Sequence, residues 1–328
     1  MDATVPDLLR LLAVPVFAWA GIQDLRTRRV PNRTWLPLVG LGVLLVGWDL
    51  LVLGPGTPGF GLYLLRVGLS VGLVGGLALG FWIIGGFGGA DAKAFLTLAV
   101  LFPTYPAYEA FGLTLPVVET TIGVFSLTVL TNAVLIGAAY PLALAVSNLR
   151  GGTLSPLSLV AREVSVASLP ARHGTLLDTD GGFTRSGLDL DALRMYLRWR
   201  RIDLATLRTT PELVDPATLP EEPGDPTDGA VGVGTAATDP SLPCASETTE
   251  ESADRWGAEA FLDALDGSAY GTSPADLRAG LDRIVAADRV WVSPGIPFIV
   301  PTVLGLVLAL IAGDLLFWVL ELLGLAGP

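Results

Sequence analysis

Residues 61–93 read GLYLLRVGLSVGLVGGLALGFWIIGGFGGADAK, and this stretch decides the class of fold. Residues 61–86 carry one charged side chain, Arg66, and exceed the roughly 20 apolar residues that a helix needs to cross a bilayer. A glycine-rich turn follows and ends in Asp91, at the border of the apolar run. Acidic residues are costly in a bilayer, so Asp91 is a candidate functional residue. The stretch predicts a membrane helix with a polar site at one end.

The composition of the whole chain agrees with a membrane protein. Of its 328 residues, 51% are hydrophobic and 16% are charged, and the mean hydropathy is +0.59. A soluble domain has about 25% charged residues. We therefore expect an all-α polytopic membrane protein with six transmembrane helices. The predicted spans are residues 4–23, 34–53, 61–86, 92–108, 117–147 and 296–324.

A polar insertion, residues 148–293, separates the fifth and sixth predicted spans. Its tract from Pro211 to Glu251 is rich in Pro, Gly, Thr and Asp, which predicts a disordered linker. Ser273-Pro274-Ala275-Asp276 has the pattern of a capping box with proline at the first helical position, so part of the insertion should fold as a helix. The expected organisation is residues 1–147 with five helices, the insertion, and residues 294–328 with the sixth.

Charge and cysteine content exclude several classes of function. The net charge is −12 and Lys93 is the single lysine among 20 basic residues, a pattern typical of proteins from high-salt environments. No Lys/Arg stripe is present that would bind nucleic acid. With one cysteine, Cys244, and one histidine, His173, neither a disulfide framework nor a structural zinc site is expected. The options for acid–base chemistry narrow to carboxylates.

Basic residues indicate the orientation, because cytoplasmic loops of membrane proteins are enriched in Lys and Arg. They gather in the first and third predicted loops and at the start of the insertion. The predicted topology places both termini outside the cell and the insertion in the cytoplasm. The residues behind this prediction are Arg26, Arg28, Arg29, Arg33, Lys93 and Arg150.

Glycines at positions 68, 72, 76 and 80 repeat every four residues along the third predicted span. Such a seam lies on one helical face and lets a neighbouring backbone approach closely. We therefore expect tight helix packing at this face.

A second pattern, within the insertion, is the basic group Arg194, Arg198, Arg200 and Arg201. This group fits either a site for anionic lipid headgroups or a solvated helix face. The lipid interpretation makes membrane lipid a candidate partner of the insertion.

Two aspartates map to the same predicted membrane face: Asp24 ends the first span and Asp91 begins the fourth. Two neighbouring carboxylates cannot both ionise cheaply, so one keeps a proton and the pair can activate water as in aspartic proteases. The preceding glycines are expected to allow positive φ and close approach of a substrate backbone. The residues alone also fit structural roles, with Asp24 paired to arginines and Asp91 as a helix cap.

At these residues the sequence resembles the type IV prepilin peptidase family, including the archaeal preflagellin (prearchaellin) peptidases. The first family motif, Asp-x-Arg-x-x-x-(Ile/Val)-Pro-Asn, is matched by residues 24–32, and the second, Gly-x-Gly-Asp, by residues 88–91 with Ala90 in place of the second glycine. Ala92-Lys93 and the stretch 291–298 entering the last helix also look like the family. The resemblance implies that Asp24 and Asp91 are catalytic. The residues it implies as motif support or substrate contacts are Arg26, Pro31, Asn32, Gly88, Gly89 and Lys93.

The resemblance implies an aspartic endopeptidase that removes the short basic class III signal peptide from type IV prepilins and prearchaellins at the cytoplasmic face of the cell membrane. It implies neither a metal nor another cofactor. Methyltransferase activity is not expected, because the chain has one cysteine and no glycine-rich cofactor loop. The source that fits the acidic composition is haloarchaeal, and the oligomeric state is not indicated.

Two alternatives come from other classes. A presenilin-type or signal-peptide-peptidase-type protease shares a Gly-x-Gly-Asp aspartate but has its other aspartate in a Tyr-Asp pair, and that pairing is not found here. A small carrier with proton-relay aspartates would show internal symmetry and carboxylates near the bilayer midplane. The two aspartates map instead to one membrane edge, which favours the peptidase.

Overall fold

The structure is a computed structural model of the whole chain, which describes residues 3–324 except 85, 111, 153–154, 180–181, 185–186, 232–253, 266–268 and 296–297. The chain forms two compact units. Unit 1 comprises Met1–Tyr140 and Ile296–Pro328, and unit 2 comprises Pro141–Gly295. The boundary between them falls at Pro141, inside the helix α7 (Phe125–Arg150).

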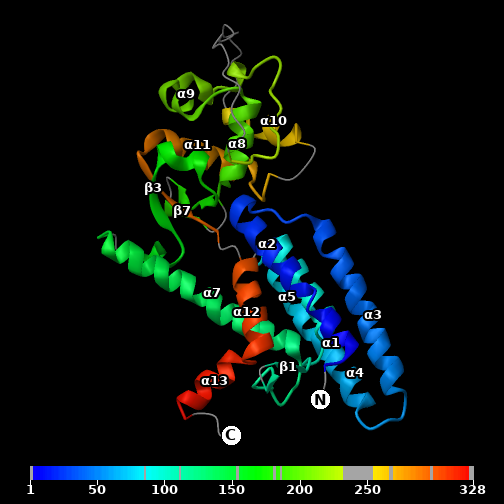
Figure 1. Cartoon of the computed structure of the whole chain (residues 1–328). Coiled ribbons are helices and arrows are strands. Elements are labelled where there is room, and N and C mark those ends of the chain that lie inside the picture. The colour runs from blue at the N-terminus through cyan, green and yellow to red at the C-terminus, as the bar shows by residue number, and fades with distance from the viewer. Residues whose placement is uncertain are drawn as a thin grey trace. The chain divides into compact units, whose positions relative to one another are not determined.

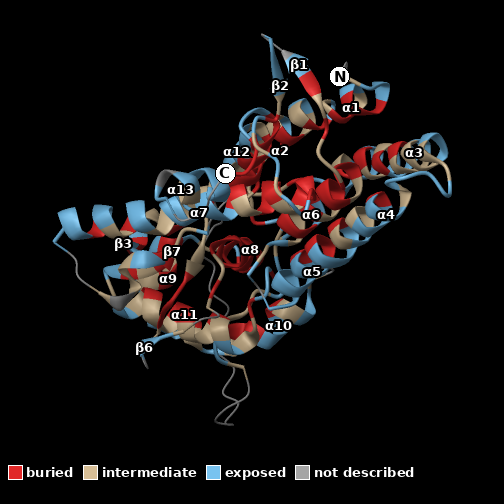
Figure 2. Cartoon of the chain, turned by 90° about the horizontal axis from the view of Figure 1, so that it is seen from below, coloured by how far each residue is buried: buried red, intermediate tan, exposed pale blue. Residues whose placement is uncertain are grey.

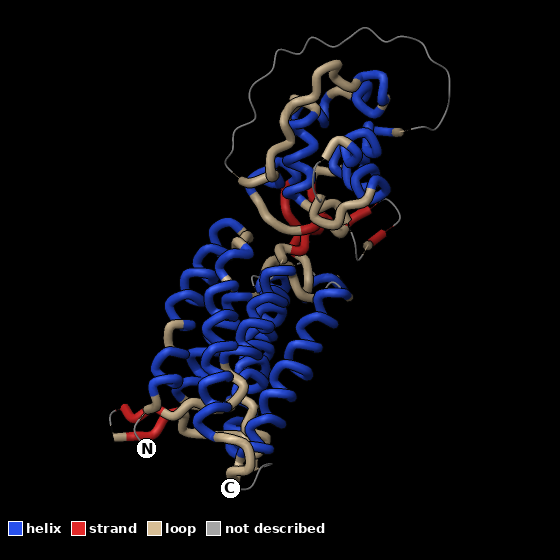
Figure 3. The backbone as a smooth tube through the Cα atoms, turned by 90° about the vertical axis from the view of Figure 1, so that its right-hand side faces the viewer, coloured by secondary structure: helices blue, strands red, loops and turns tan. Residues whose placement is uncertain are grey.

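Unit 1 is a bundle of helices that run side by side (Figures 1 and 3). A short hairpin of antiparallel strands, β1 (Tyr108–Ala110) and β2 (Leu113–Leu115), precedes α7. The other elements are α1 (Val5–Arg10), α2 (Ala13–Thr27), the 3-10 turn η1 (Asn32–Thr34), α3 (Leu36–Leu53), α4 (Phe60–Leu69), the π-helical turn η2 (Ser70–Val74), α5 (Gly75–Ile83), α6 (Gly89–Leu101), α12 (Ile299–Ile311) and α13 (Leu315–Leu322).

Four helical segments in the described part of the chain are long and apolar enough to cross a membrane: Val5–Thr27, Asn32–Leu53, Phe60–Ile83 and Phe125–Arg150. They agree with the first, second, third and fifth predicted spans. The protein is therefore a mostly helical, multi-pass membrane protein.

The other two predicted spans form shorter helices. Of residues 92–108, only 92–101 are helical; they belong to α6, which has 13 residues and stops at Leu101, just before Pro103. Residues 296–324 are divided at Asp314, whose Oδ1 accepts the Leu316 and Phe317 N–H groups at 3.0 and 3.1 Å and so begins α13. Its Oδ2 accepts a hydrogen bond from Thr128 at 3.1 Å, so Asp314 makes an interhelical contact, as a polar residue in a span is expected to do.

The core of unit 1 surrounds α6, which Figure 2 colours as buried along most of its length. Close approaches of backbones occur at glycines outside the predicted seam. A Cβ on Gly42 of α3 would lie 3.0 Å from Leu101 Cα, and one on Gly21 of α2 would lie 3.2 Å from a methyl of Val303 in α12. Glycine at these two positions lets the neighbouring helices pack closely.

The predicted glycine seam packs differently from the expectation. Gly68, Gly72, Gly76 and Gly80 are exposed, and a Cβ on any of them would meet no atom within 4 Å. The prediction of tight packing at this face within the chain is wrong. The buried face of the same span contains Tyr63, Ser70, Val74 and Ala78 instead.

Unit 2 contains strands as well as helices, so the all-α prediction is wrong for the insertion. Its antiparallel sheet has the order β3-β7-β4, with β3 at Arg162–Ser165, β7 at Arg289–Ser293 and β4 at Thr175–Leu176. Val290 and Val292 of β7 are buried while their neighbours are more exposed, as expected for a half-buried strand. Residues 291–293 thus belong to a strand.

The helices of unit 2 pack around α8 (Leu190–Trp199), all ten residues of which are buried (Figure 2). Tyr196 and Trp199 lie with ring centroids 5.4 and 5.5 Å from that of Phe261.

The capping box predicted at Ser273 and Asp276 is confirmed: Ser273 Oγ accepts the Asp276 N–H at 3.1 Å, and Asp276 Oδ2 accepts the Ser273 N–H at 3.2 Å. The other elements are β5 (Asp178–Thr179), β6 (Gly182–Phe183), α9 (Leu204–Thr209), α10 (Ala258–Asp263), α11 (Pro274–Ala286) and the 3-10 turns η3 (Pro156–Leu159), η4 (Val166–Ala171), η5 (Pro211–Val214), η6 (Pro216–Thr218) and η7 (Arg255–Gly257).

The basic group of α8 is an internal feature of unit 2. Arg194, Arg198 and Arg200 are 5%, 9% and 3% exposed, and only Arg201 is exposed to solvent. Neither a lipid site nor a solvated face fits the three buried side chains. Both predictions for them are wrong, because these guanidinium groups donate hydrogen bonds to backbone carbonyls inside unit 2.

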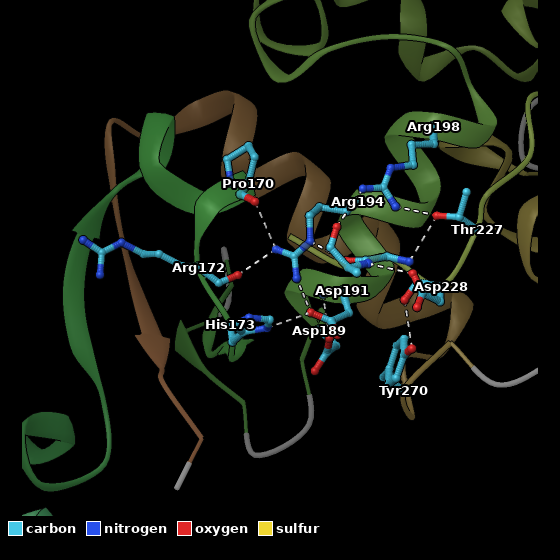
Figure 4. Close-up of polar contacts among 12 residues, drawn as sticks. Pro170, Arg172, His173, Asp189, Asp191, Arg194, Arg198, Thr227, Asp228 and Tyr270 are labelled. Atoms are coloured by element: carbon cyan, nitrogen blue, oxygen red, sulfur yellow. Dashed lines mark hydrogen bonds and ion pairs between the residues drawn. The ribbon is translucent and has the colours of Figure 1, made fainter. Parts of the chain in front are cut away.

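Figure 4 shows what two of these arginines contact. Arg194 donates to the carbonyl oxygens of Arg172 at 2.6 Å and Pro170 at 3.3 Å and pairs with Asp191. Arg198 reaches Thr227 Oγ1 in the same view. Each arginine therefore ties a different loop to α8.

The predicted linker at 211–251 is partly folded. Residues 211–214 and 216–218 form the turns η5 and η6, and Leu213 is 2% exposed. Arg200 holds this segment by donating to the Leu213 carbonyl at 2.7 Å and to Thr218 Oγ1 at 2.6 Å. The prediction of disorder is wrong for 211–231, and residues 232–251 lie outside the described residues.

Candidate active site

Asp24 lies near the end of α2 on its buried face and is 7% exposed. The same face contains Phe17, Ala20 and Gly21, at the spacing of successive helical turns. The helix ends three residues later, at Thr27, because Arg28 adopts the left-handed conformation with φ of 57° and donates its N–H to the Asp24 carbonyl at 2.9 Å. Asp24 is therefore held in the last turn of a membrane-spanning segment.

Asp91 lies in the first turn of α6 and is 9% exposed. Its Oδ2 accepts the Gly88 N–H at 3.1 Å, and the backbone N–H of Ile299 at the start of α12 lies close enough to interact electrostatically with the carboxylate. Free N–H groups at a helix start favour a negative charge, which suits an aspartate in this place. Two separate parts of unit 1 thus position this carboxylate.

The glycines before Asp91 do not have the backbone conformation that was expected. Gly88 has φ of −68° and ψ of 159°, an extended conformation, and neither Gly86 nor Gly89 has positive φ. Gly88 is needed for another reason, because a Cβ there would lie 3.1 Å from Asp91 Oδ2. Glycine at position 88 leaves room for the Asp91 carboxylate to accept the Gly88 N–H at the start of α6.

Ala90, which replaces the second motif glycine, lies inside α6. A helical residue has negative φ, so alanine fits this position without strain and has a higher helix propensity than glycine. Its side chain packs against the core of unit 1. Alanine at position 90 is therefore compatible with the observed position of Asp91.

The carboxylates of Asp24 and Asp91 interact electrostatically with each other, and Arg28 interacts with both. The structure thus brings together two acidic groups that are 67 positions apart in sequence. In two neighbouring carboxylates, ionisation of one opposes ionisation of the other. A neighbouring cation partly offsets this repulsion.

The predicted support residues lie in the two chain segments that carry this pair. Lys93 donates from Nζ to Asn32 Oδ1 at 2.7 Å, which joins the two sequence motifs directly. Pro31 precedes η1 in an extended conformation and sets the direction of the loop that carries Asn32. Arg26 is exposed in the last turn of α2. Gly89 begins α6, where a Cβ would lie 3.9 Å from Lys93 Nζ.

Sequence reasoning missed the aromatic group that holds the loop before Asp91. The Phe87 ring stacks on Phe95 of α6 at a centroid distance of 5.5 Å. It also packs against Phe298 and Phe81, each at 5.1 Å. The signal available in the sequence was the single aromatic residue among the glycines of 85–89.

The fold and the site together define a multi-pass membrane protein with a buried pair of aspartates from two helices. Residues 11–142, which include Asp24 and Asp91, match the model of the type IV leader peptidase family, and residues 260–315 match the model described as archaeal peptidase A24 C-terminus type II. The chain is thus similar to the type IV leader peptidase family over the part that carries both aspartates. This agrees with the resemblance that the two aspartate motifs indicated.

A curated relative is the prepilin peptidase EppA of Methanothermobacter thermautotrophicus. It is 31% identical to this chain over 141 residues, which cover 41% of this chain and 34% of the relative. The matched region is therefore about a third of the relative's length.

Proposed function

We propose that this protein is a membrane aspartic endopeptidase that removes the short basic leader from type IV prepilins and prearchaellins. The observation that carries the proposal is the pair of buried carboxylates, Asp24 and Asp91, in the family's two motifs. The match to a prepilin peptidase supports this class of substrate. A hydrophobic helix that follows the leader would place the scissile bond at the membrane edge.

In the proposed mechanism the ionised aspartate takes a proton from a water molecule as the water oxygen attacks the scissile carbonyl carbon. The protonated aspartate donates its proton to the carbonyl oxygen, which gives a neutral tetrahedral intermediate. Collapse of the intermediate breaks the C–N bond: the leaving nitrogen takes a proton from the first aspartate, and one hydroxyl of the intermediate returns its proton to the second aspartate as the product carbonyl forms. All atoms and protons are then accounted for, and both carboxylates return to their starting charge states.

The proposed topology has six crossings, with both termini outside and residues 148–293 in the cytoplasm. The short helices α6 and α12 would then be the fourth and sixth crossings, with the flanking loops completing the passage. The arginines of the first loop, Lys93 and Arg150 support this orientation by the positive-inside rule. It places Asp24 and Asp91 at the cytoplasmic face, where a leader would be available.

The experiment that tests the function is cleavage of a prepilin or prearchaellin precursor by the full chain in membranes. Asp24→Asn and Asp91→Asn should each abolish conversion of precursor to the shorter product. Asp314→Asn is the matched control, because Asp314 is also a buried carboxylate of unit 1 and asparagine keeps its helix cap. Full cleavage by either active-site variant would contradict the proposal.

A further inference from the structure

The helix that carries Asp91 is unusual for a membrane helix, because it ends inside unit 1. The 13 residues of α6 span about 20 Å, short of the roughly 30 Å of a bilayer core. Leu101 and Phe102, at its C-terminal end, are fully buried. The last carbonyl groups of any helix have no partner within it, and here they are also shielded from water.

Three other elements of unit 1 satisfy these carbonyl groups. Ser70 Oγ, from the π-helical turn η2, donates to the Ala99 carbonyl at 2.6 Å. Arg10 Nε, from α1, donates to the Leu101 carbonyl at 2.9 Å, and the Ser126 N–H of α7 donates to the Phe102 carbonyl at 3.0 Å. Ser70 Oγ and Ser126 Oγ are also 2.6 Å apart, so two of the three groups bond to each other. Arg10, Ser70 and Ser126 are here called the α6 anchor.

The anchor is built from fully buried groups. Arg10 is 2% exposed, and Ser70 and Ser126 are 0% exposed. The Arg10 charge is balanced by Asp7 Oδ1 at 3.0 Å and Asp49 Oδ2 at 2.5 Å, and Asp49 also accepts from Tyr63 at 3.0 Å. The π-helical turn at Ser70 interrupts the regular α-helical pattern of its span, a feature frequent at functional sites.

The anchor lies at the far ends of the two segments that carry the aspartates. Arg10 belongs to the span Val5–Thr27, which ends with Asp24 in its last turn. Its partner Leu101 ends α6, which begins with Asp91 in its first turn. Because α6 is one continuous short helix, a bond at Leu101 fixes the depth of Asp91 at its start. Arg10 ends α1, which the turn at Leu11 and Leu12 joins to α2, the helix that carries Asp24. A shift of one helical turn would move Asp91 by about 5.4 Å.

We infer that the α6 anchor, and Arg10 in particular, is a positioning device for the reaction, which sets the depth of Asp91 relative to Asp24. Arg10 touches neither aspartate, so it acts through the helix. The expected effect on cleavage kinetics rests on the proposed function. The expected effect on the separation of Asp24 and Asp91 does not depend on that function.

The test compares Arg10→Lys and Ser70→Ala in the full chain. Lysine keeps a positive charge near Asp7 and Asp49. It lacks the Nε–H group with which Arg10 donates to the Leu101 carbonyl. The matched control is Thr131→Ala, because among the described residues the Thr131 hydroxyl donates only to the Leu127 carbonyl of its own helix, at 3.0 Å. Precursor cleavage is measured per folded molecule, with kcat, KM and the pH profile of kcat determined separately.

We expect Arg10→Lys to lower kcat by about tenfold to a hundredfold, with KM within twofold, since small displacements of catalytic groups have effects of this size. The acidic limb of the pH profile should also move, because the repulsion between two carboxylates depends on their separation. Ser70→Ala should show the same changes more weakly. Unchanged kcat per folded molecule and unchanged pH limbs in both variants would overturn the inference.

A second measurement separates this inference from the proposed function. In a Cys244→Ser background, cysteines replace Asp24 and Asp91, and the yield of intramolecular cross-link with a short bis-thiol reagent is measured with and without Arg10→Lys. The yield should fall when Arg10 is replaced. If Asp24→Asn and Asp91→Asn prove fully active, the proposed function fails, and an unchanged cross-link yield would then overturn the anchor as well.

Discussion

Lys93 and Asn32 form a hydrogen bond of 2.7 Å that joins the helix start carrying Asp91 to the loop that follows Asp24. An exposed bond of this kind contributes only about 1 kcal/mol to stability, so its value is in the alignment of the two motifs. Lys93→Met and Asn32→Ala should each lower precursor cleavage by about tenfold with little change in the amount of folded protein. The double variant should lose no more than either single one, because both changes remove the same contact. Additive losses would show that the two residues act separately.

Gly88 is the position at which the space for the Asp91 carboxylate is tightest. Gly88→Ala would place a Cβ 3.1 Å from Asp91 Oδ2, so the carboxylate would have to shift by a few tenths of an ångström, which weakens its hydrogen bond to the Gly88 N–H. We expect cleavage to fall by about tenfold or more, although the extended backbone of Gly88 accepts alanine. The measurement is cleavage per folded molecule in membranes.

The control for this substitution is Gly76→Ala, in α5, where a Cβ meets no atom within 4 Å. Alanine in a helix is favoured over glycine by about 0.5–1 kcal/mol, so this variant should cleave normally and resist heat slightly better. Normal cleavage by Gly88→Ala would contradict the prediction, because it would show that a Cβ at position 88 does not disturb the Asp91 carboxylate.

The placement of the aspartate pair could be predicted from sequence, but part of its surroundings could not. Arginines near Asp24 and Lys93 near Asp91 indicated a shared membrane face, because charged side chains concentrate in cytoplasmic loops. Ile299 acts on Asp91 electrostatically through its backbone N–H, and every residue type except proline offers such a group. No side-chain pattern could therefore have marked it.

The errors in the predicted fold have physical causes. The alternation of Val290, Trp291 and Val292 is a strand signal, but a run of five residues beside an apolar helix resembles the entry to that helix. The arginines of α8 were expected at the surface because Arg is rarely buried without partners, and here backbone carbonyls of distant loops supply the partners. Such partners cannot be recognised from local sequence.

Asp189 begins α8 and gives unit 2 a specific pH dependence. Burial, together with the charge of Asp191, raises the pKa of Asp189 from 3.8 to about 6. A carboxyl that holds its proton more tightly in the folded state contributes stability below pH 4, and this contribution is lost as the pH rises through about 6. Asp189→Asn stays neutral, so it should slow hydrogen exchange of α8 at pH 7.5, by about 2 kcal/mol in opening free energy, and have little effect at pH 4.

Asp203, which caps α9, is the matched control with the opposite sign. Its hydrogen bonds to Thr206 lower its pKa, so its charged form contributes stability that is present above its ordinary pKa of 3.8 and lost as the pH falls below it. Asp203→Asn should therefore speed exchange of α9 at pH 7.5 and have less effect at acidic pH. Equal responses of the two variants would contradict the assignment of their environments.

Arg200 should be the residue on which the fold of 211–218 depends most. Its guanidinium donates to the Leu213 carbonyl, to Thr218 Oγ1 and to Tyr196 Oη, and it is 3% exposed. Arg200→Met keeps most of the side-chain volume but leaves a buried carbonyl without a donor, at a cost of about 1–3 kcal/mol. Hydrogen exchange in 211–218 should accelerate by about tenfold or more. Arg201→Met, at the exposed neighbouring position, should leave exchange there unchanged. If both variants protect the segment equally, the buried arginine does not hold it, and the packing of Leu213 alone would account for its order.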